Sequence, residues 1–194
     1  MNRDMLETVI AARSIRSFDS EYRITPEVME ALVRTASLSP SARNDQPLKY
    51  RISSNAEEVE ALLCMTKWAG FLTDTVLPPE GGHPTGFITV CHDTSVSPRS
   101  EFSAMDVGIA AAVINLAACE RGFGTCMLGS FDRERVPALL KLPENCVPVL
   151  VIALGTPAES PILCSVKDGD TKYFRNDAGL HFVPKRALEE ILIK

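Results

Sequence analysis

The chain has 194 residues, 45% of them hydrophobic, and a net charge of −5 at neutral pH. This length and apolar content can close a sizeable core and predict one domain over residues 1–194. Because the net charge is negative and no long lysine or arginine run occurs, the surface needed for sequence-independent nucleic-acid binding is excluded. We therefore expect no nucleic-acid partner.

The N-terminal sequence MNRDMLETVIAARSI alternates charged and apolar groups and contains no secretory-type apolar segment, which predicts a cytoplasmic location. The longest nearly apolar run, Val107 to Cys119, is shorter than the roughly 20 residues that cross a bilayer, so no membrane partner is expected. The six cysteines form no CxxC pair and are typical of reduced thiols that pack as small hydrophobic groups. A redox-active or metal-binding role is the minority alternative.

Apolar spacing predicts a short helix over Asp4 to Arg13. Thr25 followed by Pro26 is a typical helix start, and the apolar stripe that follows predicts a second helix ending before Pro40. Alternation over Lys49 to Ser53 predicts a strand, and Asn55 is placed to cap a helix that runs through Trp68.

The segment from Thr73 to Gly86 contains several prolines and glycines and predicts a loop, which is a candidate lid. Phe87 to Cys91 is β-branched and aromatic, as in a buried strand. The longest predicted helix covers Ser103 to Arg121, with Gly122 as its left-handed cap. Because this helix is apolar nearly all round, we expect it either in the core or across a dimer interface.

Gly124 to Gly129 predicts a short strand, and Asp132 can cap the helix that follows it. Val147 to Gly155 is the strongest strand signal and is typical of an inner strand buried on both faces. Thr156 to Pro184 is predicted to be irregular, and Lys185 to Leu192 to form a closing helix. Alternating helices and strands indicate an α/β or α+β sheet covered by helices.

The first candidate site is the polar stretch from Ala12 to Phe18. Arg13 and Arg16 can each grip a phosphate with paired hydrogen bonds, and the hydroxyls of Ser14 and Ser17 can add single ones. Taken alone, these residues are more typical of a solvated helix end with surface arginines.

The second candidate site is the stretch from Ser39 to Pro47. Its prolines stiffen a loop that carries Ser41, Asn44 and Gln46, whose side chains can read the edge of a flat ring. The alternative is an ordinary polar loop with Asx-type turns. Together the two stretches predict a site for a phosphate-bearing, ring-containing cofactor.

Three further segments strengthen this interpretation: the Asp106-Val107-Gly108 start of the long alanine-rich helix, Glu120 to Phe131, and Ala153 to Glu159. With the two polar stretches, they resemble the FMN-dependent nitroreductase family, in the family's order and over nearly the whole chain. The resemblance implies an α+β fold, a three-layer α/β/α sandwich. It also implies a homodimer in which the long central helix packs against its mate, with two FMN sites at the interface.

The resemblance also assigns roles to individual residues. It places Arg13 and Ser14 on the FMN phosphate and ribityl chain, and Arg16 nearer the pyrimidine edge of the ring. It places the backbone of Leu128 and Gly129 facing flavin N5. The other subunit would contribute Pro40, Ser41, Ala42, Asn44 and Gln46. Lys185 and Arg186 resemble a basic pair that closes over the phosphate, although they are also typical of first-turn charges on a surface helix.

Three departures from the family pattern are evident. Ala12 stands where a second basic residue is common, which shifts the expected phosphate grip toward Arg16 and Arg186. Leu48 replaces a common tryptophan. The tail between Pro161 and Pro184 is longer than in the simplest members and is expected to shape the substrate pocket.

By resemblance, the protein would be an FMN-dependent oxidoreductase that takes hydride from NADH or NADPH and reduces small-molecule acceptors such as nitroaromatics or quinones. The electron donor and the acceptor would bind in turn, in a ping-pong mechanism, and no side chain is assigned a catalytic role. His83, His92 and His181 lack metal-site spacing and are predicted to be surface or loop residues.

Two alternatives remain open. The first is a flavin reductase, enone reductase, dehalogenase or flavin-fragmenting enzyme on the same scaffold, and the second is a non-catalytic FMN-binding regulatory dimer. The expected pocket lining is Trp68, Phe71, the Pro78 to Pro84 loop, and Tyr173 or Phe174.

Overall fold

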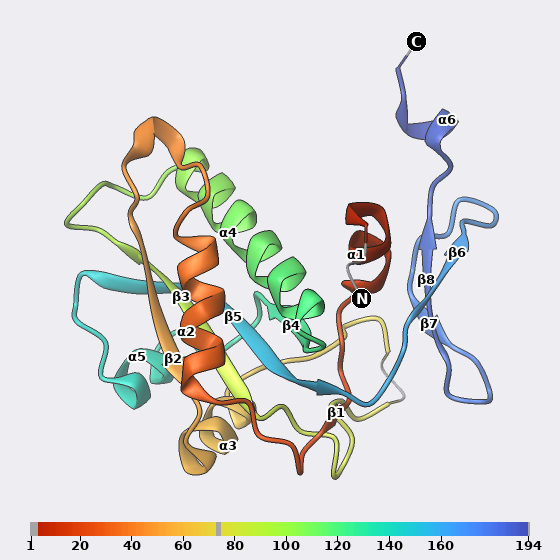
Figure 1. Cartoon of the computed structure of the whole chain (residues 1–194), viewed down its shortest axis with the longest axis horizontal. Coiled ribbons are helices and arrows are strands. Elements are labelled where there is room, and N and C mark those ends of the chain that lie inside the picture. Colours follow the sequence, from red (N-terminus) through yellow and green to blue (C-terminus); the bar gives the residue numbers. More distant parts are fainter. Residues whose placement is uncertain (1–3, 73–74, 194) are drawn as a thin grey trace.

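The computed structural model describes residues 4–72 and 75–193. Its centre is a five-stranded sheet in the order β1-β5-β3-β2, with β4 also paired to β5 (Figure 1). Every pairing in this sheet is antiparallel. The strands are β1 (Phe18–Asp19), β2 (Leu48–Ser53), β3 (Gly86–Asp93), β4 (Gly124–Leu128) and β5 (Cys146–Pro157).

Both faces of the sheet are covered by helices. Val151 and Ala153 of β5 point into a core shared with α3 (Ala56–Cys64) and α5 (Arg135–Leu140). Ile152 and Leu154 point to the opposite face, where α2 (Pro26–Ala36) and α4 (Glu101–Glu120) close a second core. This alternation follows from the two-residue period of a strand. The predicted three-layer α+β sandwich is confirmed.

Helix α4 divides its apolar surface between the core and the outside. Ala110, Ile114 and Ala118 are buried against the sheet, whereas Phe102 and Met105 are 64% and 60% exposed. By length and composition alone, α4 could cross a membrane. In this structure it packs instead along the sheet beside α2 (Figure 1). The prediction of a long apolar helix is confirmed, and Gly122 ends it with a φ of +80°.

Helix α3 is shorter than predicted. The Asn55 side chain caps it by accepting from the N–H groups of Glu57 and Glu58 at 3.0 and 3.2 Å. The helix ends at Cys64, so its predicted extension through Trp68 is wrong. Trp68 lies beyond the helix because its ring packs edge-on against Phe18, with centroids 6.5 Å apart. The indole N–H donates to Thr66 Oγ1 at 2.9 Å.

The prediction that Thr156 to Pro184 is irregular is wrong. Strand β5 continues to Pro157, and a separate three-stranded sheet follows in the order β6-β8-β7. We call residues Ile162–Lys185 the C-terminal lobe. Its strands are β6 (Ile162–Ser165), β7 (Phe174–Arg175) and β8 (His181–Lys185). The lobe stands beside α1 (Met5–Ala11), away from the central sheet (Figure 1).

The closing helix is also shorter than predicted, because Lys185 belongs to β8 and α6 covers only Leu188–Ile191. In the predicted loop from Thr73 to Gly86, Thr73 and Asp74 lie outside the described residues, and Gly86 begins β3. A short 3-10 helix, η1 (Ala42–Asn44), forms inside the second polar stretch.

A substitution at Gly124 tests how closely the first polar stretch packs on β4. A Cβ at this position would lie 2.6 Å from Ile15 Cγ1 and 2.9 Å from Ile15 Cβ. Overpacking of this kind costs about 1–3 kcal/mol. We expect Gly124→Ala to lower the free energy of unfolding by that amount in urea titrations. Gly70→Ala is the control, because a Cβ there meets no atom of the described residues within 4 Å. Equal stability of the two variants would contradict the close approach.

Candidate functional site

The first polar stretch is fixed by α4 and β4. Ile15 N–H donates to Thr125 O at 2.8 Å, which pairs the stretch with the edge of β4. Asn115 Nδ2 on α4 donates to Ala12 O at 3.2 Å, and Thr125 Oγ1 donates to Asn115 Oδ1 at 2.7 Å. Asn115 and Thr125 therefore set the path of the backbone that carries both arginines. Sequence reasoning did not identify either residue.

The guanidinium groups of both arginines in this stretch lack an ion-pair partner among the described residues. Arg16 is only 8% exposed, and the buried Nε atoms of Arg13 and Arg16 make no hydrogen bond to any residue that the structure describes. Arg13 Nη2 donates to Val9 O at 2.6 Å. Within residues 4–72 and 75–193, no carboxylate lies within 4.0 Å of either guanidinium. Because a buried unpaired charge is costly, this arrangement favours an anionic ligand.

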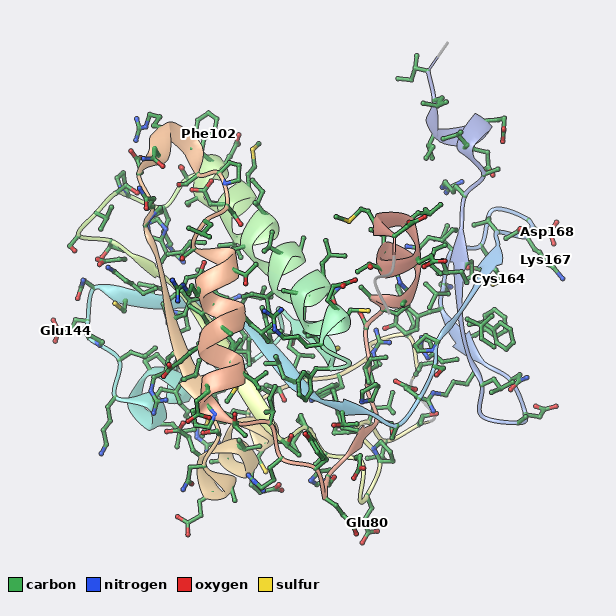
Figure 2. The ribbon with its side chains drawn as sticks, in the orientation of Figure 1. Glu80, Phe102, Glu144, Cys164, Lys167 and Asp168 are labelled. Atoms are coloured by element: carbon green, nitrogen blue, oxygen red, sulfur yellow. The ribbon has the colours of Figure 1, made fainter. Side chains whose placement is uncertain are left out.

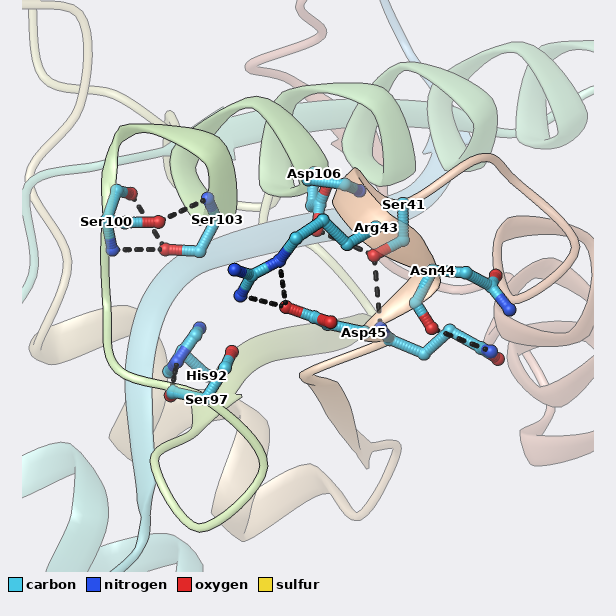
Figure 3. A network of polar contacts seen from close by, with 11 residues as sticks. Ser41, Arg43, Asn44, Asp45, His92, Ser97, Ser100, Ser103 and Asp106 are labelled. Carbon is cyan, nitrogen blue, oxygen red and sulfur yellow. Dashed lines mark hydrogen bonds and ion pairs between the residues drawn. The ribbon is translucent and has the colours of Figure 1, made fainter.

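The second polar stretch is held by Asp106 on α4 (Figure 3). Ser41 Oγ donates to Asp106 Oδ2 at 2.8 Å, and Ala42 N–H donates to Asp106 Oδ1 at 2.9 Å. Gln46 N–H in turn donates to Ser41 Oγ at 3.1 Å. Asp106 is 5% exposed, so these bonds satisfy a carboxylate inside the protein.

The backbone of this stretch is strained. Arg43, Asn44 and Gln46 have φ values of 53°, 58° and 52°. Non-glycine residues rarely adopt this region, and such strain clusters at functional sites. The Asn44 and Gln46 side chains are exposed, while an ion pair of 2.7 Å between Arg43 and Asp45 closes the turn. The loop thus holds the side-chain amides of Asn44 and Gln46 at the protein surface on a fixed backbone.

Within one chain, the two polar stretches do not meet. They line separate cavities, one containing Ser41 and Asp106 and the other containing Arg13 and Asn115. Asp106 and Asn115 are nine residues apart on α4, which corresponds to about 13 Å along the helix axis. The two halves of the predicted site therefore lie at different parts of one helix.

The remaining predicted site residues lie elsewhere. Leu128 is 4% exposed at the end of β4, and Gly129 follows at the surface. Arg186 forms an ion pair of 3.3 Å with Glu190, and Lys185 is exposed at the end of β8. No hydrogen bond or ion pair joins this basic pair to the first polar stretch in the described parts of the chain.

Arg16 is enclosed by the C-terminal lobe. Its guanidinium lies over the Tyr173 ring, 4.7 Å from the centroid, and Nη1 contacts His181 Nε2 at 3.4 Å. The rings of Tyr173 and His181 are stacked at 5.5 Å. Of the expected pocket lining, Phe71 and Tyr173 meet edge-on at 5.4 Å. Phe174 is turned toward Phe182 instead, with the two rings stacked at 5.2 Å.

The prediction that the histidines are surface or loop residues is wrong for two of them. His92 and His181 are 1% and 2% exposed, because each belongs to a strand that another element covers. His92 Nε2 lies 2.7 Å from Ser97 O (Figure 3). His83 is partly exposed beside Glu60. No cluster of three potential metal ligands occurs among the described residues.

Free thiols occur at Cys64, Cys91, Cys126, Cys146 and Cys164. Burial raises the pKa of Cys91 to about 12 and that of Cys126 to about 11. The neighbouring Cys146 adds to the first shift, while Arg16 opposes the second. Because the thiolate is the reactive form, these two residues act as small hydrophobic groups. Cys64, by contrast, is exposed.

Comparisons with known proteins identify the family. The sequence model of the nitroreductase family matches residues 9–72 and 91–156. A relative from Methanothermobacter thermautotrophicus, provisionally named an NADH dehydrogenase/NAD(P)H nitroreductase, is 30% identical over 162 residues, which cover 81% of this chain and 80% of the relative. These matches show that the chain belongs to the nitroreductase family, as the sequence resemblance predicted.

Two further matches agree with this assignment. A Bacillus subtilis relative named FMN reductase (NADPH) is 24% identical over 173 residues, which cover 79% of this chain and 66% of the relative. The crystal structure of a nitroreductase family protein from Streptococcus pneumoniae TIGR4 superposes with a TM-score of 0.73 at 18% identity, covering 98% of this chain and 100% of that one. The structural match shows that the fold extends to nearly the whole chain.

Asp106→Ala tests the anchor of the second polar stretch. The substitution removes the acceptor for Ser41 Oγ and Ala42 N–H, and hydrogen bonds to a charged group contribute about 1.5–3 kcal/mol each. We expect a loss of roughly 2–4 kcal/mol in the free energy of unfolding, measured in urea. Glu101→Gln, at the exposed start of the same helix, should change stability little. If both variants unfold at the same urea concentration, Asp106 does not hold the loop.

Proposed function

We propose that the protein is a cytoplasmic, FMN-dependent oxidoreductase that uses NADH or NADPH to reduce small-molecule acceptors such as nitroaromatics or quinones. Membership of the nitroreductase family supports this proposal, as do relatives named NAD(P)H nitroreductase and FMN reductase. The observation that carries it is the pair of guanidiniums, Arg13 and Arg16, that lack a carboxylate partner among the described residues.

The donor set fits this cofactor. A phosphate would give the Arg13 guanidinium an anionic partner, and the exposed Ser14 hydroxyl can donate one more bond to it or to the ribityl chain. Asn44 and Gln46 each carry an amide that can both donate to and accept from a flavin edge. Lys185 and Arg186 would close over the phosphate.

FMN, when bound, supplies the electron-transfer chemistry, and the protein supplies position and electrostatics. Arg16 would stand at the pyrimidine edge, where a fixed cation stabilises the negative charge of the reduced ring. The backbone of Leu128 and Gly129 would face N5. Donor and acceptor would occupy the same open face in turn, which is a ping-pong order that requires no side-chain nucleophile.

Flavin binding is the first test. Purified protein should be yellow and should bleach anaerobically with NADH or NADPH. Arg13→Ala combined with Arg16→Ala should weaken FMN binding at least about 100-fold in fluorescence titrations, because it removes two charged donors. Arg135→Ala combined with Lys141→Ala removes the same charge from exposed positions at α5 and should retain the flavin.

Each outcome separates the candidate functions. Protein that stays colourless after incubation with FMN contradicts the proposal. Bound FMN that neither nicotinamide can reduce would instead indicate a non-catalytic FMN-binding dimer. A screen of nitroaromatics, quinones, enones and free flavins would distinguish a nitroreductase from the other reductases that the same scaffold could support.

We further propose a homodimer in which α4 packs against its mate. Phe102, Met105 and Ile109 form an exposed apolar stripe on this helix, and Phe102 stands at its outer end (Figure 2). Large exposed apolar patches mark interaction surfaces. Pairing two copies of α4 would bring the loop held by Asp106 in one copy toward Arg13 and Arg16 of the other. More exposed apolar residues lie on α1 and near α6: Met5, Leu6, Val9, Ile10, Leu188, Ile191 and Leu192.

Met105→Glu combined with Ile109→Glu tests the dimer. Charges on the α4 stripe should make the protein monomeric in sedimentation experiments and should release FMN, because the second polar stretch would be lost from each site. Val76→Glu is the matched control, since Val76 is an apolar residue exposed to 85% outside α4. A monomer that still binds FMN with parental affinity would overturn the shared site.

A further inference from the structure

Three residues of the C-terminal lobe converge on Arg16 because of the pairing between β7 and β8. Arg175 lies opposite His181 in this pairing, and Tyr173 immediately precedes β7. The pairing therefore places the phenol ring, a second guanidinium and the imidazole together. No sequence pattern predicts that these side chains come together, since Arg16 and His181 are 165 positions apart.

Tyr173 and His181 restrict the Arg16 side chain in two ways. The Tyr173 ring lies 4.7 Å from the guanidinium carbon, so it limits how the planar group can tilt. Nη1 can only donate, and the 3.4 Å contact with His181 Nε2 therefore requires this nitrogen to be the acceptor. This contact, together with the bond from Nη1 to Ser14 O at 3.5 Å, sets the direction in which one edge of the guanidinium points.

The acceptor role of His181 requires a neutral ring. Burial, together with the nearby charges of Arg16 and Arg175, lowers the pKa of His181 to about 4. The imidazole is thus uncharged near neutral pH and does not repel the guanidinium. Its proton lies on Nδ1, an atom that is buried without a hydrogen-bond partner in the described structure.

Glu159 ties the lobe to the Arg16 backbone without neutralising the Arg16 side chain. Its Oε1 accepts from Arg16 N–H at 2.5 Å, while its Oε2 accepts from Arg175 Nη2 at 2.6 Å. The carboxylate forms its ion pair with Arg175. Because the guanidinium of Arg16 forms no ion pair with any described residue, its positive charge stays available to a ligand.

We propose that Tyr173 and His181 are positioning residues that hold the Arg16 guanidinium in the orientation in which it stabilises reduced flavin. This inference rests on the proposed FMN site and adds a role for the C-terminal lobe in setting the reduction potential. Neither residue has to touch the flavin. The lobe acts through Arg16 by limiting its side-chain freedom before the cofactor binds.

The test compares the midpoint potential of FMN bound to the full-length protein and to variants. Tyr173→Ala removes the ring and His181→Leu removes the acceptor. Tyr173→Phe keeps the ring, and His181→Gln can keep an acceptor near the Nε2 position. Leu180→Ala, at an exposed lobe position, controls for general loosening of the lobe. Circular dichroism and thermal melting establish that each variant folds, and Tyr173→Leu replaces Tyr173→Ala if the latter does not.

Tyr173→Ala and His181→Leu should each reduce the preference for reduced over oxidised FMN about tenfold. For a two-electron couple this lowers the potential by about 30 mV. The two conservative variants and Leu180→Ala should remain near the parental potential. In an Arg16→Ala background, removing Tyr173 or His181 should produce no further shift, because both act through Arg16.

The outcomes separate this inference from the proposed function. If the parental protein binds no FMN, or if Arg16→Ala leaves the potential unchanged, the assigned FMN site itself is wrong. If Arg16→Ala lowers the potential but Tyr173→Ala and His181→Leu do not, only the positioning role is wrong. An equal shift in Leu180→Ala would also overturn it, because the effect would then reflect general loosening of the lobe.

Discussion

The structure depends above all on the burial of β5 on both faces. Val151, Ile152, Ala153 and Leu154 are all fully buried, with alternate side chains in two different cores. A strand of this kind needs helices on both sides and neighbouring strands along its edges. Here it pairs with β1, β3 and β4, and so it joins the first polar stretch to the sheet. Its end at Pro157 leads to Glu159 and the lobe.

The central sandwich could be predicted from sequence because its signals are local. Val147 to Gly155 is apolar without interruption, and Asn55 caps a helix by accepting from N–H groups two and three residues away. The C-terminal lobe could not be predicted in this way. Its strand β7 has only two residues, and β6 and β8 place several side chains at the surface. Such segments do not show the alternation that identifies a half-buried strand.

The candidate site, like the fold, could be predicted from the sequence only in part. Arg13, Arg16 and the amide-rich loop were identifiable from residue type, since guanidinium and amide groups have specific binding chemistry. The residues that hold them were not, because their contacts are long-range: Asp106 binds a loop 64 and 65 positions earlier, and Glu159 binds a backbone 143 positions earlier. Likewise, nothing in the sequence near His181 indicates burial against an arginine. The sequence thus indicates which side chains can bind a ligand, whereas only the fold shows which residues hold those side chains in place.

The separation of the two polar stretches along α4 has a thermodynamic consequence. If a cofactor contacts one stretch from each copy, its binding and the association of the two chains share one free-energy cycle. Each cofactor then tightens association by the same factor by which association tightens its own binding. Newly made chains at low concentration would hold little cofactor, and loading would rise more steeply than linearly with protein concentration. Because the two stretches are separated along one helix, the capacity for electron transfer would rise cooperatively as the two chains assemble.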